Sequence, residues 1–420
     1  MNPARLEGSD GKNACAVEPR RRRGGLAMNG VTRLRVGMLV PSSNTALEPE
    51  VSRLAALVPD LDVHFSRVRV TRISTAPASD SQFDAEPMSA AATLLGDAKV
   101  DVVAWAGTAG SWIGPERETE LLSALRLATG APATTSTVAL LAACQALGIK
   151  RVGLVTPYTE DVVTKICGTY GRSGLEVVGE AHLGIADNWS FGNVTPSQIR
   201  QLARDVGPHE ADAVLVVCTN LRGTGVVAEL EMELGIPVLD SIGATLWHAA
   251  IVAGRPLQLA GAGDLLAQGS LRLWLAEHTT RLLESTGADR VTVRLSDPTL
   301  GFDVDSVASE AVAPGIPAIG RERSISQWEL QTVRQLQITL APLIQERSDA
   351  PPGIPELLKA RYGVRAQLLG PLDDTGELKG WISIHSSVER EWEPSDLDAL
   401  ATATAVVCDR LGWHSGVVAR

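Results

Sequence analysis

An internal repeat runs through the N-terminal part of this chain of 420 residues and restricts its possible folds. Three segments occur twice, in the same order and about 105 to 116 residues apart. The pairs are RVGMLVPSSN (35–44) with RVGLVTPYTE (151–160), DVVAWAGTAG (101–110) with DAVLVVCTNL (212–221), and GAPATTSTVA (130–139) with GIPVLDSIGA (235–244). Ordered matches at a nearly constant spacing indicate a duplicated structural unit. We therefore expect two similar halves, at about 33–145 and 149–258, that face each other.

Each half combines short apolar runs with amphipathic stretches. The runs at 34–40, 100–107, 151–157 and 212–218 are rich in β-branched residues, and turn-forming residues follow them. Helix-like stretches such as EPEVSRLAALV lie between them. Strands that alternate with helices predict βαβ units on a parallel sheet. The expected fold class for residues 31–258 is therefore α/β, with two pseudo-symmetric parallel-sheet halves.

Polar loops follow the predicted strands of both halves. They are PSSN and GTAGS in the first half, and PYTE and CTNLRG in the second. Ligands of open parallel sheets bind beyond the carboxyl ends of the strands. Two halves related by a pseudo-twofold axis would direct these loops into one shared cleft. In this alignment Gly107 of the first half is the counterpart of Cys218 of the second.

Cys218 is either a buried structural cysteine or a residue that carries chemistry. Free cysteine is among the most buried residue types, which supports the first interpretation. Its expected place at a strand end, just before the next helix, supports the second, because backbone N–H groups there can lower the pKa of a thiol. A thiol of near-neutral pKa can donate or accept a proton at carbon. The position opposite another polar loop favours the chemical role.

Other loop residues suggest an anion site, although each also has a plain structural explanation. The GTAGS loop offers backbone N–H groups and the hydroxyls of Thr108 and Ser111, which suit a carboxylate or an enolate oxygen, but it could be an ordinary βα turn. Asn44 could bind a carboxylate or cap a helix. The Tyr158 phenol could donate to an anion. Asn188 lies in ADNWSFG, which is either part of the site or a surface turn.

Composition excludes several classes of function. The net charge of −11 argues against nucleic-acid binding, and no apolar stretch is long enough for a membrane span. Five dispersed cysteines without CxxC spacing and seven histidines without an HxxxH pair predict neither disulfides nor a metal site. Residues 1–30 are interpreted as a disordered tail, since no apolar segment of a secretory signal follows Arg20–Arg23. A cytoplasmic location is expected.

The motifs VPSSNTALEPE, AGTAGS, LVTPY, DN and VVCTN resemble those of the aspartate/glutamate racemase superfamily. Within it, the chain is similar to the branch of maleate isomerases and arylmalonate decarboxylases. CTNLRG together with LGIADNWSF resembles the ectoine-utilisation members of this branch. The resemblance covers about 33–258. It implies two flavodoxin-like halves with the active site between them, and no cofactor.

The resemblance also implies roles for individual residues. In maleate isomerases of this family one cysteine attacks the substrate double bond and a second moves a proton, whereas arylmalonate decarboxylases keep the second as the protonating acid. Cys218 matches the second cysteine, and the first would fall at Gly107. The substrate-binding positions carry over to Asn44, Gly107, Thr108, Ala109, Tyr158, Asn188, Thr219 and Asn220.

Three of these positions depart from the decarboxylase pattern and leave the substrate open. Ala109 stands where that pattern has a serine, and Thr219 and Asn220 stand where it has glycines. We expect a cofactor-independent isomerase or decarboxylase that acts on a small mono- or dicarboxylic acid through an enolate-like intermediate, with Cys218 as proton donor. The alternative is a ligand-binding sensor that has lost catalysis. For the enzyme, Gly107→Cys is expected to create racemase-like exchange.

A second domain is expected at 262–420. Helices are predicted at 265–285 and 327–346, together with strands at 289–297, in VRAQLLGPL and in LKGWISIHS, and a last helix with Ser395 as its N-cap. This order predicts an α+β domain. The segment from GELKGWISIHS to the last helix is similar to GAF domains, which implies a small ligand or dimerisation. The long first and last helices favour a homodimer or a higher homo-oligomer.

Overall fold

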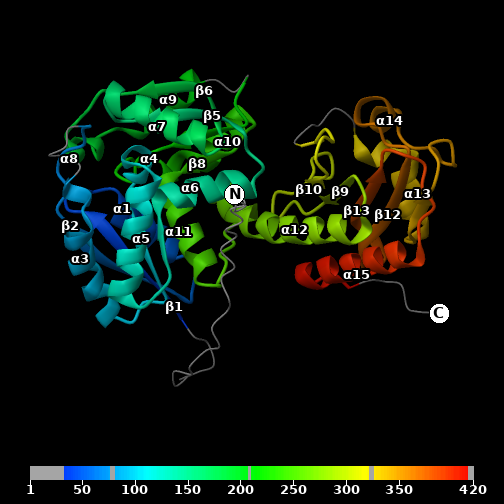
Figure 1. Cartoon of the computed structure of the whole chain (residues 1–420), viewed down its shortest axis with the longest axis horizontal. Helices are drawn as coiled ribbons and strands as arrows, with labels where there is room; N and C mark the ends of the chain where they lie inside the picture. The colour runs from blue at the N-terminus through cyan, green and yellow to red at the C-terminus, as the bar shows by residue number, and fades with distance from the viewer. Residues whose placement is uncertain (1–32, 76–80, 207–209, 321–325, 415–420) are drawn as a thin grey trace, which may run out of the picture. The chain divides into compact units, whose positions relative to one another are not determined.

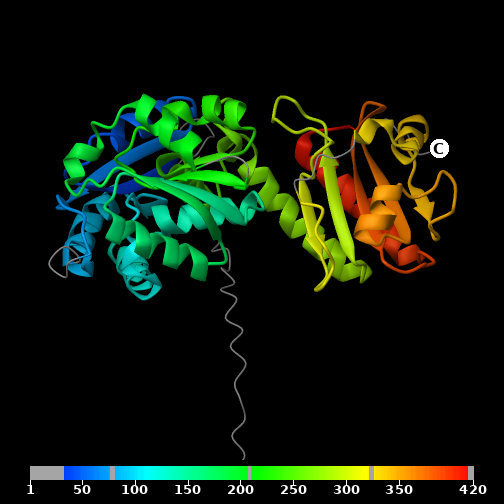
Figure 2. The same ribbon diagram turned by 90° about the horizontal axis from the view of Figure 1, so that it is seen from above.

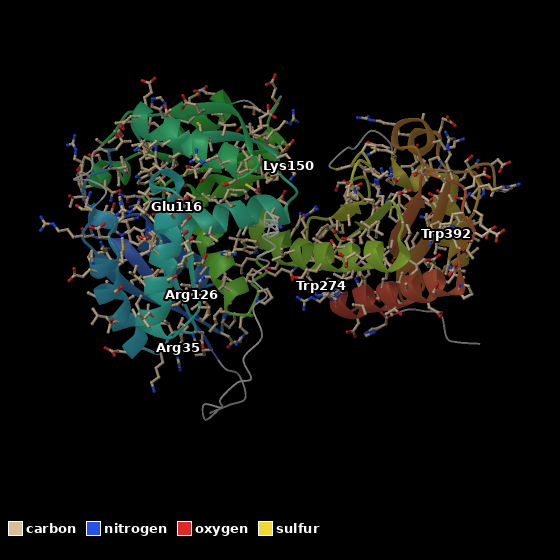
Figure 3. All side chains as sticks on the ribbon, viewed as in Figure 1. Arg35, Glu116, Arg126, Lys150, Trp274 and Trp392 are labelled. Atoms are coloured by element: carbon tan, nitrogen blue, oxygen red, sulfur yellow. The ribbon has the colours of Figure 1, made fainter. Side chains whose placement is uncertain are left out.

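The structure is a computed structural model that describes residues 33–75, 81–206, 210–320 and 326–414 (Figure 1). The predicted tail at 1–30 lies outside the described residues. Charged side chains such as Arg35, Glu116 and Arg126 lie on the outside of the first half, while the strands supply its core (Figure 3). Among the helices that the structure describes, none is long and apolar enough to cross a membrane.

The first half contains a four-stranded parallel sheet in the order β2-β1-β3-β4. Its central strand β1 is buried almost throughout, as expected for a parallel strand that is covered on both faces. The strands are β1 (Leu34–Pro41), β2 (Leu61–Val68), β3 (Val102–Trp105) and β4 (Ala133–Thr135). The helices are α1 (Leu47–Ala55), η1 (Ser81–Phe83), α3 (Ala85–Asp97), α4 (Gly110–Ile113), α5 (Pro115–Thr129) and α6 (Ser136–Ala146).

The second half repeats this arrangement in the order β6-β5-β7-β8, again with all strands parallel. The strands are β5 (Arg151–Thr156), β6 (Glu176–His182), β7 (Ala213–Val216) and β8 (Val238–Asp240). The helices are α7 (Glu160–Arg172), α8 (Asn188–Phe191), α9 (Pro196–Asp205), η2 (Thr224–Val226), α10 (Val227–Leu234) and α11 (Ser241–Val252). The equal strand order confirms the predicted α/β class with two similar parallel-sheet halves.

The third repeated segment joins the two halves. Thr135 caps α6 by accepting a hydrogen bond from the Val138 N–H, and Asp240 caps α11 in the same way through the Ile242 and Gly243 N–H groups. Helix α11 packs against α6 and against strands β3 and β4 of the first half. The repeat therefore places two similarly capped helices where the cores meet.

The C-terminal domain contains an antiparallel five-stranded sheet in the order β10-β9-β13-β12-β11 (Figure 2). Its long helices α12 (Asp264–Thr286) and α15 (Pro394–Leu411) pack together and contribute to one hydrophobic core with the sheet. The strands are β9 (Arg290–Leu295), β10 (Ser309–Val312), β11 (Leu343–Gln345), β12 (Ala366–Asp374) and β13 (Glu377–Ser386). The other helices are η3 (Gln327–Glu329), α13 (Gln331–Thr339) and α14 (Glu356–Tyr362).

Two details of the sequence prediction for this domain were wrong. The helix expected at 327–346 ends at Thr339, and β11 follows it, because Leu340 adopts a left-handed backbone and Pro342 cannot continue a helix. The N-cap of α15 is Glu393 rather than Ser395. Glu393 and Asp396 form a reciprocal capping box, which leaves Ser395 inside the first turn.

Candidate functional site

The structure brings the polar loops of both halves together. Thr219, after β7, donates through Oγ1 to the carbonyl oxygen of Ala106, after β3, at 2.9 Å. Asn44, after β1, donates through Nδ2 to the carbonyl oxygen of Thr219 at 3.1 Å. All nine residues predicted for the site are buried: Asn44, Gly107, Thr108, Ala109, Tyr158, Asn188, Cys218, Thr219 and Asn220. The segments that follow β3 and β7, which contain Gly107 and Cys218, are thus joined by a direct hydrogen bond.

The side chain of Asn220 forms several hydrogen bonds that hold the loops of the site together. Its Oδ1 accepts hydrogen bonds from the N–H groups of Thr45 at 2.9 Å and Ala46 at 3.2 Å, while its Nδ2 donates to the carbonyl oxygen of Asn188. The Nδ2 of Asn188 donates in turn to Ser43 Oγ at 2.7 Å. Asn188 therefore belongs to the buried site and is not a surface turn residue.

Asn44 caps a helix, which is one of the two roles that its sequence position suggested, and carboxylate binding stays a prediction. Its Oδ1 accepts hydrogen bonds from the N–H groups of Ala46 at 3.0 Å and Leu47 at 2.9 Å, so the side chain caps the start of α1. Its Nδ2 faces the site and bonds Thr219. The capping bonds fix the direction in which this amide group points.

Cys218 does not precede a helix as we expected. It follows the end of β7, and η2 and α10 begin only after the loop has passed Gly223. Its Sγ accepts a hydrogen bond from the Asn220 N–H at 3.3 Å, and its own N–H donates to Ser241 Oγ at 3.1 Å. Burial raises the pKa of the thiol to about 12, although Tyr158 and the backbone N–H groups favour the thiolate. The expected lowering of the pKa was therefore wrong, and the thiol is protonated at neutral pH.

Tyr158 connects Cys218 with the loop of the first half. Its hydroxyl group lies 2.7 Å from Thr108 Oγ1, and it also interacts with the Cys218 thiol. Burial raises the pKa of the phenol well above its usual range, so the phenol is neutral. The backbone N–H groups of Gly107, Thr108 and Ala109 make no hydrogen bond within the described part of the chain. They remain available to an oxyanion.

Trp105 occupies the space beside Gly107. A Cβ atom on Gly107 would lie 2.6 Å from Cε2 and Cζ2 of the Trp105 indole, and 2.8 Å from its Nε1. The indole is buried and is rigid beyond its two side-chain torsions, so it cannot move aside without repacking. A side chain at position 107 is therefore incompatible with the present orientation of Trp105.

Aromatic residues that the sequence analysis missed form one wall of the site. Edge-to-face contacts link Phe83 to Trp105 and Trp112, Trp112 to Tyr158, and Tyr158 to Phe191, with ring centroids 5.2 to 6.3 Å apart. Their positions in the sequence are unrelated, so no pattern could have grouped them. Trp105 Nε1 and Trp112 Nε1 are buried polar atoms without a hydrogen-bond partner among the described residues. Both can donate to an anion.

A buried polar network behind the GTAGS loop was also missed. Ser111 Oγ lies 3.2 Å from both Thr137 Oγ1 and Tyr170 Oη, so its hydroxyl group is engaged in this network. Glu118 accepts a hydrogen bond from Thr135, and burial raises the pKa of its carboxyl group. A Cβ atom on Gly110 would collide with this carboxyl group, which explains the glycine there. A glutamate on an amphipathic helix usually faces solvent, so the sequence offered no signal for it.

The described residues contain no cluster of three histidine, cysteine or acidic side chains that could hold a metal ion. Four free cysteines are described: Cys144, Cys167, Cys218 and Cys408. The site therefore consists of neutral hydrogen-bond donors, one protonated thiol and an aromatic wall. Such a site can bind an acid and transfer a proton.

Maleate isomerases and an arylmalonate decarboxylase are similar to this chain in sequence or in structure. The maleate isomerase of Geobacillus stearothermophilus is 28% identical over 246 residues, which are 56% of this chain and 97% of the relative. The arylmalonate decarboxylase of Bordetella bronchiseptica is 33% identical over 157 residues, 36% of this chain and 65% of the relative. A Nocardia farcinica maleate cis-trans isomerase, solved with a covalently bound succinylcysteine intermediate, has a TM-score of 0.52 and 28% identity over 56% of this chain and 98% of its own.

The fold and the loop set define a protein of the maleate isomerase and arylmalonate decarboxylase type, followed by a further domain. Residues 36–266 match the family model of arylmalonate decarboxylase, and residues 270–408 match that of the GAF domain. The chain belongs to the arylmalonate decarboxylase family and carries a C-terminal GAF domain. This confirms the resemblance found in the sequence. The boundaries at 31–258 and 262–420 stay predictions.

Proposed function

We propose that this protein is a cofactor-independent isomerase or decarboxylase that acts on a small mono- or dicarboxylic acid through an enolate-like intermediate. Cys218 is the proton donor. The observation that carries this proposal is a protonated, buried thiol that shares a site with unpaired N–H donors and faces a glycine rather than a second cysteine. A thiol of high pKa is an effective acid toward an enolate carbon, which is far more basic.

The proposed binding groups surround the acid. The N–H groups of Gly107, Thr108 and Ala109 receive the oxygen on which negative charge develops. The hydroxyl group of Tyr158 and the amide group of Asn44 bind a carboxylate, with Asn188, Thr219 and Asn220 holding the second-half loop in place. The indole N–H groups of Trp105 and Trp112 add further donors.

For a malonate-type acid, the proposed reaction is a decarboxylation that is followed by protonation of the α-carbon. The bond between the α-carbon and one carboxylate breaks, CO2 leaves, and the electron pair of that bond forms an enediolate with the remaining carboxylate. Cys218 transfers its S–H proton to the α-carbon. The resulting thiolate accepts hydrogen bonds from the Asn220 N–H and Tyr158 until it takes a proton from water.

Chemistry from the opposite side is disfavoured by Gly107 and Trp105. Gly107 has no nucleophile, so a covalent cysteine adduct of the kind described for the Nocardia farcinica relative cannot form there. Trp105 fills the neighbouring volume. The proposal therefore favours proton delivery from Cys218 alone.

Turnover and isotope uptake test the proposal directly. The full chain is incubated in D2O with maleate, arylmalonates and alkylmalonates, and the products are followed by NMR. We expect one acid to be converted with one deuterium at the α-carbon, and Cys218→Ser to reduce the rate at least 100-fold while the thermal midpoint stays unchanged. Equal turnover by the variant would overturn the role of Cys218.

A sensor without catalysis is the second candidate. Its support is that Asn44, Thr108, Tyr158, Asn188 and Asn220 are all engaged with one another or with adjacent backbone in the present structure. Tight binding of an acid without conversion or deuterium exchange would favour the sensor. The cytoplasmic location and the homo-oligomeric state stay predictions, the second of which a measurement of mass in solution checks.

A further inference from the structure

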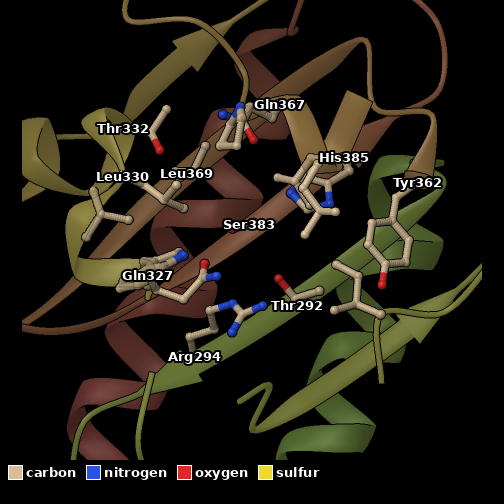
Figure 4. A pocket seen from close by; sticks show the side chains of 16 residues that line it. Thr292, Arg294, Gln327, Leu330, Thr332, Tyr362, Gln367, Leu369, Ser383 and His385 are labelled. Carbon is tan, nitrogen blue, oxygen red and sulfur yellow. The ribbon is translucent and has the colours of Figure 1, made fainter. Parts of the chain in front are cut away.

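Buried polar side chains gather at two places outside the loops around Cys218. In the C-terminal domain, Thr292, Arg294 and His385 surround a small cavity (Figure 4). In the α/β domain, a second cluster adjoins the GTAGS loop, and we call it the Glu118 network. Its members come from strand β4 and from the helices α4, α5, α6 and α7, and they are Ser111, Glu118, Thr135, Thr137 and Tyr170.

The hydrogen bonds of the Glu118 network run in a single direction while Glu118 is ionised. A carboxylate only accepts, so Thr135 and Thr137 both donate to it. Each hydroxyl group has one proton, and that of Thr137 is thereby used. Ser111 therefore donates to Thr137 Oγ1 at 3.2 Å, and Tyr170 donates to Ser111 Oγ at 3.2 Å. The protons of four hydroxyl groups thus point toward one carboxylate.

Protonation of Glu118 would break this order. The new O–H group would need an acceptor, whereas both threonine hydroxyl groups beside it already donate to it. Reversal of the chain through Thr137 and Ser111 would leave the buried O–H group of Tyr170 without an acceptor among the described residues. Buried polar groups are normally satisfied. A fully satisfied network therefore requires the carboxylate.

The Glu118 network supports the GTAGS loop from behind. A Cβ atom on Gly110 would collide with the Glu118 carboxyl group, so the carboxylate lies against the backbone that directly follows Ala109. The next residue, Ser111, is tied to the network through its side chain. Its N–H group donates to the carbonyl oxygen of Thr108 at 3.0 Å. The network thus fixes the start of α4, and α4 fixes the loop.

A second support of the loop comes from Tyr158. Its hydroxyl group lies 2.7 Å from Thr108 Oγ1, and its ring packs edge to face on Trp112 of α4, with the centroids 5.2 Å apart. Tyr158 also interacts with the Cys218 thiol, so this support belongs to the proposed site itself. Glu118 acts on the loop only through α4 and its neighbours. It is a positioning residue.

We propose that Glu118, as a carboxylate, positions the N–H donors of the GTAGS loop. The kinetic consequence rests on the proposed function, whereas the structural role does not. Since the charge of a carboxylate repels an acid, Glu118 does not contribute to substrate binding. Loss of the carboxylate is therefore expected to lower kcat by about tenfold without raising KM, a smaller effect than the loss of a whole oxyanion donor, which costs about 100-fold or more.

The ionisation of Glu118 is balanced between two effects. Burial raises the pKa of the carboxyl group, and the hydrogen bonds from the two threonines lower it. Among the described residues, no charged side chain contributes to this balance. The titratable groups on the helices around it are Cys144 on α6 and Cys167 and Tyr170 on α7. Burial raises the pKa of each, so all three stay neutral near pH 7.

Hydrogen exchange tests the structural role without any substrate. Mass spectrometry of the full chain at pH 7 follows the backbone N–H groups of Ser111, Trp112 and Ile113, which bond back to the loop. We expect Glu118→Gln to lower their protection by about tenfold, the effect of one hydrogen bond. Glu120→Gln, at an exposed position of the same helix, should leave it unchanged. Equal protection in the two variants would overturn the proposal.

The pH dependence of kcat tests the kinetic role with the acid that the turnover experiment identifies. We expect the wild-type rate to fall toward acid pH, above the usual range of a glutamate. This acid limb should move to higher pH in Thr137→Val, which removes one donor to the carboxylate. It should stay in place in Tyr170→Phe, whose hydroxyl group does not touch the carboxylate, and should disappear in Glu118→Gln.

The outcomes separate this inference from the proposed function. An acid limb that Glu118→Gln leaves unchanged, such as one set by Asp240, would overturn the kinetic role. If no acid is converted, the proposed function fails, and hydrogen exchange still decides whether Glu118 holds the loop. Thr137→Val gives a second exchange test if Glu118→Gln fails to fold, because it removes one hydroxyl group and retains the shape.

Discussion

At the scale of single residues, the proposed chemistry depends on what lies opposite Cys218. In a duplicated site, the equivalent position would be the natural place for a second acid. Here Gly107 leaves that position without a functional group, and the indole of Trp105 fills the space that a side chain would need. The pair Trp105 and Gly107 thus acts as one steric unit.

This unit changes the expectation for Gly107→Cys. The new side chain would overlap the Trp105 ring, and overpacking of a buried site costs about 1–3 kcal/mol. We expect Gly107→Cys alone to be less stable by this amount in urea unfolding and to show no racemase-like exchange in D2O. The double variant with Trp105→Val is expected to recover stability and to gain exchange. Exchange by the single variant would contradict the steric argument.

The ionisation of Cys218 gives a second residue-level prediction. With a pKa of about 12, the thiol stays protonated from pH 6 to 9, and alkylation by iodoacetamide requires the thiolate. The partly exposed Cys167, whose pKa burial raises too, is expected to react first. Peptide mass spectrometry at pH 8 measures both. Labelling of Cys218 that is as fast as that of a free cysteine peptide would contradict the assignment.

The sequence was sufficient to locate these residues but not to describe their environment. The repeat and the loop motifs marked Cys218, Gly107 and Tyr158, because strand ends and their turns leave local patterns. The orientation of Trp105 and the pKa of Cys218 depend on packing between segments that are distant in the chain. No local pattern encodes either quantity.

At the scale of elements, the N-terminus of α11 places a buried carboxyl group next to the site. Asp240 accepts hydrogen bonds from Ile242 N–H, Gly243 N–H and Thr224 Oγ1, while its Oδ1 has no partner among the described residues. Burial raises the pKa of this carboxyl group to about 6, because it outweighs the hydrogen bonds. The adjacent Ser241 holds the backbone of Cys218.

This carboxyl group predicts a pH-dependent contribution to stability. Its pKa is higher in the folded chain than in the unfolded chain, so its favourable contribution is complete below pH 3.8 and disappears as the pH rises through 6. Relative to Asp240→Asn, the wild-type free energy of unfolding should rise by about 2–3 kcal/mol between pH 7 and pH 4. Parallel stability curves for the two proteins would exclude this role.

The ends of helices and strands were harder to predict from the sequence than their presence. Two strands of each parallel sheet, β1 and β3 in the first and β5 and β7 in the second, were predicted because buried parallel strands are continuous apolar runs, whereas their outer neighbours were not. The helix at 327–346 was drawn too long because helical spacing continues through Leu340, although Pro342 forces the chain into β11. Single backbone-breaking residues outweigh a periodic pattern that surrounds them.

At the scale of the whole molecule, the loops around the site also hold the two halves together. Asn220 alone contributes two hydrogen bonds that cross between them, from the N–H groups of Thr45 and Ala46, and a third to Asn188 within the second half. Removal of this side chain deletes the bonds to the N–H groups of Thr45 and Ala46, of which Ala46 keeps its bond to Asn44. The geometry of the proposed site and the cohesion of the α/β domain therefore depend on the same residues.

Asn220→Ala measures this dependence. The loss of three hydrogen bonds should lower the free energy of unfolding by about 2–4 kcal/mol. Asn193→Ala, at an exposed position of the same half, should change it by less than about 0.5 kcal/mol. Urea unfolding of the full chain gives both values. Equal stability of the two variants would show that the halves cohere without Asn220.

The burial of the nine site residues has a kinetic consequence. Cys218 and Tyr158 are each no more than 3% exposed, and the side-chain amide groups of Asn44, Asn188 and Asn220 are bonded to protein. An acid can reach the thiol only when these bonds exchange protein partners for ligand atoms, so arrival and departure both require the loops to separate. Solvent uses the same passage, and the brief separations limit its access to the proposed enediolate. Slow association of the acid and slow release of the product are therefore expected of a site from which water is excluded.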